Sequence, residues 1–119
     1  MSSYSRFEDT EVWKDAIQLA KAVYLLTKPF PKEETYALTD QIRRAATSVS
    51  ANIAEGFGRE GKNDVLHFLT ISYGSLQETK SFLYLATELE LCDEQPAILA
   101  KIESIQKQIN AIKRAIRAK

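Results

Sequence analysis

The sequence predicts an all-α fold, an antiparallel up-down four-helix bundle in which residues 1–119 form a single domain. Glycine and proline are scarce, with 4 and 3 among 119 residues, which favours long helices over a turn-rich β protein. Four successive segments carry apolar residues three and four positions apart, the spacing that places them on one face of a helix. No segment shows the alternation expected of a β-strand, and the hydrophobic fraction of 45% is ordinary for a globular chain.

The first helix is expected over about residues 10–27. Asp9 or Thr10 provides a side-chain oxygen that can cap the free amides of its first turn. The helix should end at the KPFP segment, because Pro29 and Pro31 lack an amide donor and disfavour helical backbone in the preceding residue. Its apolar face comprises Val12, Trp13, Ala16, Ile17, Leu19, Ala20, Val23, Tyr24 and Leu26.

The second helix is expected over about residues 38–55. Gly56 suits the left-handed backbone position that often follows the last turn of a helix. The apolar stripe of this helix comprises Leu38, Ile42, Ala45, Ala46, Val49 and Ile53.

The third helix is expected over about residues 63–91, with Asn63 or Asp64 as its N-cap. Its seam follows a heptad pattern and comprises Leu69, Ser72, Leu76, Thr79, Leu83 and Ala86. Further apolar residues lie off this seam, namely Leu66, Phe68, Ile71, Tyr73, Phe82, Tyr84 and Leu85. A helix that is apolar on more than one face is either central to a core or buried by another subunit. A four-helix bundle has no central helix, so the pattern predicts a homo-oligomer.

The fourth helix is expected from about residue 93 onward. Its isoleucines alternate by four and three positions, at Ile98, Ile102, Ile105, Ile109, Ile112 and Ile116. Short connections between four helices of this kind are typical of an up-down bundle.

A polar stripe runs beside the apolar stripe of the second helix and comprises Gln41, Arg44, Ser48, Asn52 and Glu55. Ser75 and Glu78 of the third helix are expected to face it, with Gly74 permitting close approach. One interpretation is an interhelical hydrogen-bond network that sets the register of the helices, with an Arg44–Glu78 or Arg44–Glu55 ion pair. The alternative is acid–base catalysis by Glu55 and Glu78. The network is the simpler account, because no nucleophile, metal site or water-activating base accompanies these residues.

Catalytic, metal-binding and cofactor-binding residues are not evident in the sequence. His67 and Cys92 are the single histidine and cysteine, and 25 residues of helix would hold them roughly 37 Å apart. The glycines between Gly56 and Gly61 lack the lysine of a phosphate-binding loop. These observations predict a protein that is not an enzyme and has no cofactor, metal or small-molecule substrate. A lone cysteine, with no signal peptide or membrane-spanning run, predicts a soluble cytoplasmic protein.

The charges are balanced in total but not along the chain. Sixteen basic and sixteen acidic residues give a net charge of zero, which counts against a strong nucleic-acid binder. The final stretch KQINAIKRAIRAK nevertheless carries basic residues and no acid, although such a tail also complements the dipole of a helix C-terminus. The candidates for nucleic-acid contact are Lys107, Lys113, Arg114, Arg117 and Lys119, together with Arg43, Arg59 and Lys62.

Three segments carry a resemblance to a known family. They are VW near the start, FPKEETYALTDQIRRAATSVSANIAEGFGR, and FLTISYGSLQET, with the most specific matches at residues 41–45, 52–56 and 74–78. This pattern resembles bacterial four-helix bundle proteins encoded within intervening sequences of 23S ribosomal RNA genes. The resemblance implies a compact bundle, often assembled as a homopentamer, and no catalytic residues. It also implies kinship to accessory proteins of diversity-generating retroelements, where a basic pentamer surface engages nucleic acid and a reverse transcriptase.

Two functional hypotheses follow for this chain. The first is a non-enzymatic, self-associating bundle that binds nucleic acid without sequence specificity or accompanies a nucleic-acid enzyme. The second is a protein–protein scaffolding or regulatory assembly without nucleic-acid binding.

Overall fold

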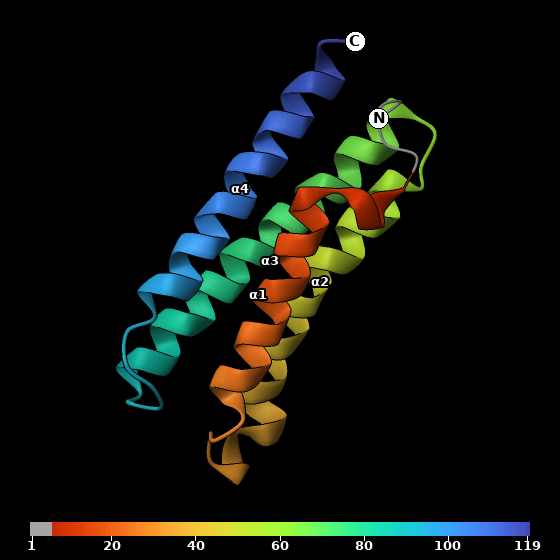
Figure 1. The fold of residues 1–119 in the computed structure, drawn as a ribbon. Coiled ribbons are helices and arrows are strands. Elements are labelled where there is room, and N and C mark those ends of the chain that lie inside the picture. The colour runs from red at the N-terminus through yellow and green to blue at the C-terminus, as the bar shows by residue number, and fades with distance from the viewer. Residues whose placement is uncertain (1–5) are drawn as a thin grey trace.

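A computed structural model describes residues 6–119 of the chain, and these residues form an all-α four-helix bundle (Figure 1). The four helices run alternately down and up, so that helices adjacent in sequence are antiparallel, as predicted. No β-strand occurs within residues 6–119. The helices are α1 (Glu11–Thr27), α2 (Asp40–Phe57), α3 (Lys62–Glu88) and α4 (Pro96–Arg117).

The start of α1 is capped in the expected way. The Thr10 side-chain oxygen accepts a hydrogen bond from the Trp13 amide at 3.3 Å, which satisfies one of the free donors of the first turn. A short 3-10 helix (Phe7–Asp9) precedes this cap, and Phe7 packs edge-on against Trp13 with ring centroids 5.2 Å apart. Helix α1 ends at Thr27, just before the first of the two prolines.

The connection between α1 and α2 contains a 3-10 turn (Lys32–Glu34) and a π-helical turn (Thr35–Thr39). The backbone at Ala37 departs from helical geometry, with φ −118° and ψ −108°, and this kink separates the turn from α2. Regular α-helix therefore begins at Asp40, two residues later than the periodicity suggested.

Two expectations about glycines are wrong. Gly56 does not adopt a left-handed backbone beyond the helix end, because α2 continues through Phe57 and no described glycine has a positive φ. Gly56 is instead buried against α3, where an added Cβ would lie 3.2 Å from the Cβ of Phe68. Gly74, which was expected to permit close approach to α2, is exposed and has nothing within 4 Å of an added Cβ.

The beginnings of α3 and α4 also differ from expectation. Helix α3 begins at Lys62 with Gly61 at the N-cap, and neither Asn63 nor Asp64 caps it. Helix α4 begins at Pro96, because proline lacks the amide that would be unsatisfied in the first turn of a helix.

The predicted seams form the core. All six seam residues of α3 are buried, and so are all residues of the apolar stripe predicted for α2. Five of the six isoleucines of α4 are buried, and the sixth, Ile112, is partly exposed. Most of these side chains join one cluster of buried apolar residues contributed by all four helices. A smaller cluster around Phe30, Leu38 and Ala86 closes the end of the bundle opposite the α2–α3 connection and the last turn of α4.

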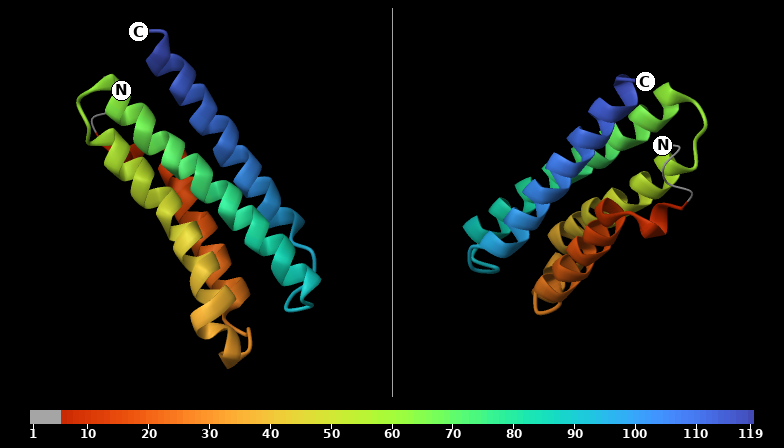
Figure 2. Two further views of the ribbon diagram at one scale, coloured as in Figure 1. Left: turned by 180° about the vertical axis from the view of Figure 1, so that it is seen from behind. Right: turned by 45° about the horizontal axis from the view of Figure 1, so that its top comes forward.

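Each helix packs against two neighbours, in the pairs α1–α2, α2–α3, α3–α4 and α1–α4. Helices α1 and α3 therefore occupy diagonal corners. Helix α1 lies in the foreground of Figure 1, whereas α3 lies in the foreground of the rear view in Figure 2. The bundle is elongated, with extents of 47 × 24 × 21 Å.

Candidate nucleic-acid interface

The polar stripe of α2 meets α3 through hydroxyl and amide groups. Asn52 Nδ2 donates to the backbone oxygen of Ser48 at 2.8 Å and to Ser48 Oγ at 2.9 Å. Ser75 Oγ of α3 donates to Ser48 Oγ at 2.9 Å. A further serine that the stripe did not include, the fully buried Ser72, donates to the Val49 carbonyl oxygen at 2.9 Å. Hydrogen bonds from two serines therefore link α3 to α2 inside the bundle.

The charged members of the stripe do not join this network. Arg44 was expected to pair with Glu78 or Glu55, but its Nε lies 3.0 Å from the Asp40 carboxylate one turn earlier. Glu55 pairs with Arg59 at 3.1 Å. Both ion pairs are exposed and join residues one turn apart on the same stretch of chain. Gln41 and Glu78 are also exposed, because they lie on the flank of α2 or α3 that faces solvent.

Two glutamines of α4 make contacts that the polar stripe predicted from the sequence did not include. Gln106 Nε2 donates to Gln77 Oε1 of α3 at 2.7 Å, and Gln108 Nε2 donates to Asp15 of α1 at 2.8 Å. These two residues flank the isoleucine seam on its two sides. Both contacts could have been predicted from this position, because a long polar side chain beside a buried seam can reach the neighbouring helix.

Arg43 lies apart from the other candidate nucleic-acid contacts. Its Nε donates to Thr27 Oγ1 at 2.8 Å, and its guanidinium lies 4.5 Å above the Tyr24 ring centroid. Thr27 is buried at the C-terminal end of α1, near the end of the bundle opposite the C-terminus. Arg43 therefore ties α2 to α1, and the structure separates it from the basic residues of α4.

Most of the remaining basic candidates gather at the end of the bundle where the α2–α3 connection meets the last turns of α4. Arg59, Lys62 and Lys119 line one cavity of about 200 Å³, together with one acidic residue, Glu60. Lys62 Nζ donates to the backbone oxygen of Lys119 at 3.1 Å. Arg59 is partly engaged, because it also stacks 4.8 Å from the Phe68 ring centroid in addition to pairing with Glu55.

Helix α4 presents the other basic side chains. Lys107, Arg114 and Arg117 are all exposed, on the side of α4 away from the isoleucine seam. Lys113 leans toward α3, where its Nζ donates to Thr70 Oγ1 at 2.8 Å. Partial burial lowers the pKa of Lys113 below its usual value, and the nearby charge of Arg117 lowers it further.

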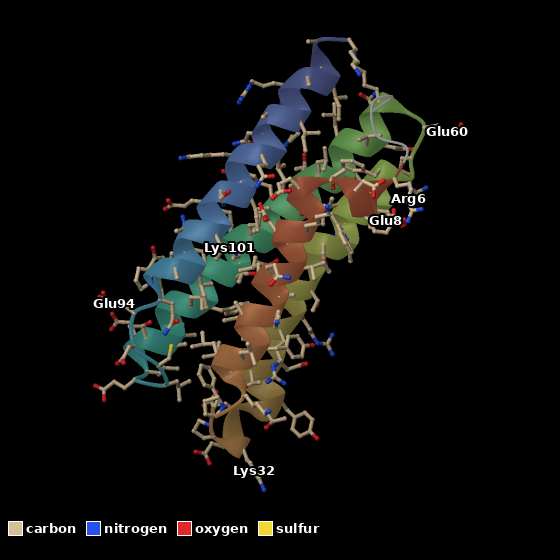
Figure 3. The ribbon with its side chains drawn as sticks, viewed as in Figure 1. Arg6, Glu8, Lys32, Glu60, Glu94 and Lys101 are labelled. Carbon is tan, nitrogen blue, oxygen red and sulfur yellow. The ribbon has the colours of Figure 1, made fainter. Side chains whose placement is uncertain are left out.

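The charges of the α3–α4 hairpin are polarised along its length. The last residue of α3, Glu88, and the connection to α4 together carry four acidic residues and no basic one, the other three acids being Glu90, Asp93 and Glu94. In Figure 3, Glu94 marks this acidic end, while Glu60 marks the α2–α3 connection at the opposite, basic end. A polyanion approaching the molecule would therefore be favoured at the basic end and repelled at the other.

Residues 6–119 offer neither a metal-binding cluster nor a membrane-spanning helix. No group of three or more histidine, cysteine or acidic side chains lies close enough there to hold a metal ion. No helix in the same range is both long and apolar enough to cross a membrane.

Known proteins resemble this chain in fold and in sequence. A solved structure of a protein of unknown function from the S23 ribosomal protein family of Bacteroides thetaiotaomicron superposes with a TM-score of 0.76. That similarity covers 86% of this chain and 97% of the other at 22% identity, so it speaks for the fold alone. No curated protein matches the chain significantly. Residues 8–114 match the family of 23S rRNA-intervening sequence proteins, and the chain therefore belongs to that family.

Proposed function

We propose that this chain is a non-enzymatic, self-associating helical module that binds the phosphate backbone of nucleic acid, in the bacterial cytoplasm, through the basic end of the bundle. The proposed contact surface comprises Arg114, Arg117, Lys119 and Lys62 at this end and Lys107 about two turns earlier on α4, with Lys113 and Arg59 at its margin. The single observation that supports it best is the convergence of basic residues from α4 and from the α2–α3 connection at one end of the molecule.

The chemistry of this surface suits phosphates better than bases. Lysine and arginine donate hydrogen bonds to phosphate oxygens, and such contacts position a protein without reading sequence. Among the described residues of this end, the Phe68 ring is already covered by Arg59, so it offers no stacking platform for a base. Binding should therefore be sequence-independent and should weaken steeply as salt rises.

One copy alone should bind weakly. The chain has no net charge, and the acidic end of the α3–α4 hairpin opposes long-range attraction of a polyanion. Self-association would repeat the basic end several times on one particle. Linked weak sites then bind far more tightly than a single site, provided that their geometry lets one nucleic acid reach them together.

A second candidate function is protein scaffolding without nucleic acid. The observation that favours it is the number of large apolar side chains left exposed on α1 and α3, including Tyr24, Leu25, Tyr84 and Leu85. Exposed apolar surface of this kind marks protein interaction sites more often than nucleic-acid sites.

The test is a salt titration of binding to a single-stranded RNA of mixed sequence. A variant with Lys107, Arg114 and Arg117 all changed to alanine should bind more weakly than wild type at low salt. The slope of log K against log salt should fall by about two to three, since each lost phosphate contact removes roughly 0.7 to 1 from it.

The control variant removes the same charge elsewhere, at Lys32, Arg44 and Lys101. It should retain the wild-type affinity and slope, because these residues lie away from the basic end. Equal losses for the two triple variants would show that only total charge matters. No binding by wild type at low salt would overturn the nucleic-acid proposal and leave scaffolding as the function to pursue.

A further inference from the structure

We infer that the outward face of α1 in one copy of this chain packs against the outward face of α3 in a second copy. This inference rests on the self-association that forms part of the proposed function, and it is independent of nucleic-acid binding. Three features carry it: the composition of the two faces, a glycine that the single chain does not explain, and the matching heptad spacing of the faces.

The outward face of α1 combines apolar and basic side chains. Lys14, Lys21 and Lys28 follow one another at intervals of seven residues, and all three are exposed. Ile17 and Tyr24, also seven residues apart, lie beside them, and Tyr24 leaves 45% of its surface exposed. Between Lys14 and Lys28 the one acidic residue is Asp15, and it points toward α4, where Gln108 donates a hydrogen bond to it.

The outward face of α3 combines apolar and acidic side chains. Ile71 and Leu85 are exposed on it, as is Leu89 at the C-cap just beyond, and Leu85 leaves 45% of its surface exposed. Glu78 lies midway between Ile71 and Leu85, and Glu88 lies about one turn beyond Leu85. The two faces are therefore both apolar along their length and opposite in charge. Complementary charge of this kind selects one partner and orientation over others.

Gly74 lies in the middle of the α3 face. Glycine weakens the interior of a helix relative to alanine, because it gives up more backbone freedom when the helix forms. Within this chain nothing approaches the position, since an added Cβ would meet no atom within 4 Å. Contact with a second copy would explain the glycine, because the missing Cβ leaves a recess between Ile71 and Glu78 that a side chain of the second copy can enter.

The spacing of the two faces specifies a parallel register. When Lys21 lies opposite Glu78, Ile17 falls opposite Gly74, and one heptad later Tyr24 falls opposite Ser81. Each bulky side chain of α1 then meets the smallest residues of the α3 face. The flanking lysines, Lys14 and Lys28, would cover Ile71 and Leu85 with their aliphatic stems while their ammonium groups stay in solvent.

The antiparallel alternative fits less well. With the same Lys21–Glu78 pair, reversing one helix would set Ile17 against Phe82 and Tyr24 against Ser75, which is already buried against α2. The parallel register is therefore the one that both size and charge favour.

This contact joins two different surfaces and so repeats from copy to copy. Because α1 and α3 occupy diagonal corners of the bundle, the two faces of one chain point in opposite directions and cannot meet each other. A contact between unlike faces closes into a ring or extends as a filament. The parallel register keeps all bundles pointing the same way, which places their basic ends side by side.

The first experiment measures assembly by light scattering over a range of protein concentrations. Lys21→Glu and Glu78→Lys, made singly, should each raise the concentration needed for half-maximal association by more than about tenfold, because each places like charges opposite one another. The double variant carries both changes and should recover wild-type association. Lys32→Glu, at the tip of the α1–α2 hairpin (Figure 3), changes the net charge by the same amount as Lys21→Glu and should have no effect.

The second experiment tests the register by disulfide trapping in a Cys92→Ser background. Ile17→Cys combined with Gly74→Cys should give covalent dimers and longer chains under mild oxidation. Ile17→Cys combined with Ser104→Cys, on the exposed side of α4, should not. Circular dichroism of every variant should match wild type, because the substituted positions lie on the surface or have room for the new side chain.

The outcomes separate this inference from the proposed function. A wild type with the 13.4 kDa mass of one chain at all concentrations would overturn self-association and the inference with it. An assembling wild type that tolerates both charge reversals and gives no 17–74 cross-link would overturn this interface alone. Weakened single variants without recovery in the double variant would overturn the Lys21–Glu78 register.

Discussion

Replacing Ile105 by alanine tests the packing of α4 most directly. Ile105 is 0% exposed and belongs to the core cluster contributed by all four helices. The substitution removes three carbons, and the lost burial costs about 2.4 kcal/mol at roughly 0.8 kcal/mol for each. The cavity left behind adds to this loss, so the total should be about 3 to 4 kcal/mol, within the range measured for such changes.

A loss of this size is large compared with the total stability of a small domain, which is about 5–15 kcal/mol. Urea unfolding followed by circular dichroism should show a midpoint lowered by about 1.5–2 M, taking a slope near 2 kcal/mol/M. The melting temperature should fall by roughly 10–15 °C for a chain of this length. Wild type and variant must be compared at one protein concentration, since self-association adds to apparent stability.

Ile112→Ala is the matched control, because it makes the same chemical change one heptad later on the same helix. Ile112 is only partly buried, so its loss should cost about 1 kcal/mol. Equal destabilisation by the two variants would refute the reasoning, because it would mean that burial along the seam does not decide the cost.

Two further predictions concern single positions. Gly56→Val should destabilise the bundle by about 1–3 kcal/mol in urea unfolding, because its Cβ would lie 3.2 Å from the Cβ of Phe68 and the branched side chain would push α2 from α3. Gly58→Ala, whose Cβ would make only ordinary contacts, should be near neutral, and a similar loss at both sites would contradict this account. Because of Lys113, the free energy of unfolding should change with pH in the alkaline range just below 10.5. Its folded-state pKa is lowered below the usual value of 10.5, so the folded chain binds fewer protons than the unfolded chain between those two values, and stability rises with pH there. The unfolding free energy of wild type, measured relative to that of Lys113→Met, should therefore increase as pH rises toward 10.5. A difference that does not change with pH would contradict the lowered pKa of Lys113.

The helices and their buried faces follow from the sequence by itself. Apolar residues three and four positions apart have one arrangement that buries them together, and this is why the isoleucines of α4 and the seam of α3 were predictable residue by residue. Thr10 was predictable as a cap for the same local reason, since a cap bonds within its own first turn.

Contacts between helices were decided only by the tertiary structure. The sequence placed Arg44 beside Glu78 and Gly74 against α2, but the rotation of each helix about its axis turns these residues to solvent. Successive residues of a helix point in directions 100° apart, so a small rotation of the helix decides whether a residue at the edge of an apolar stripe is buried or exposed. The spacing of apolar residues alone does not fix that rotation.

The basic end of the bundle shows the same division. The sequence revealed which residues are basic, and it grouped Arg43 with Arg59 and Lys62 because nothing in the chain order separates them. Folding sends Arg43 to one end of α2 and Arg59 to the other, since an 18-residue helix is about 27 Å long. Which charges act together is therefore a property of the packed bundle, because electrostatic interaction depends on distance in space and not on distance along the chain.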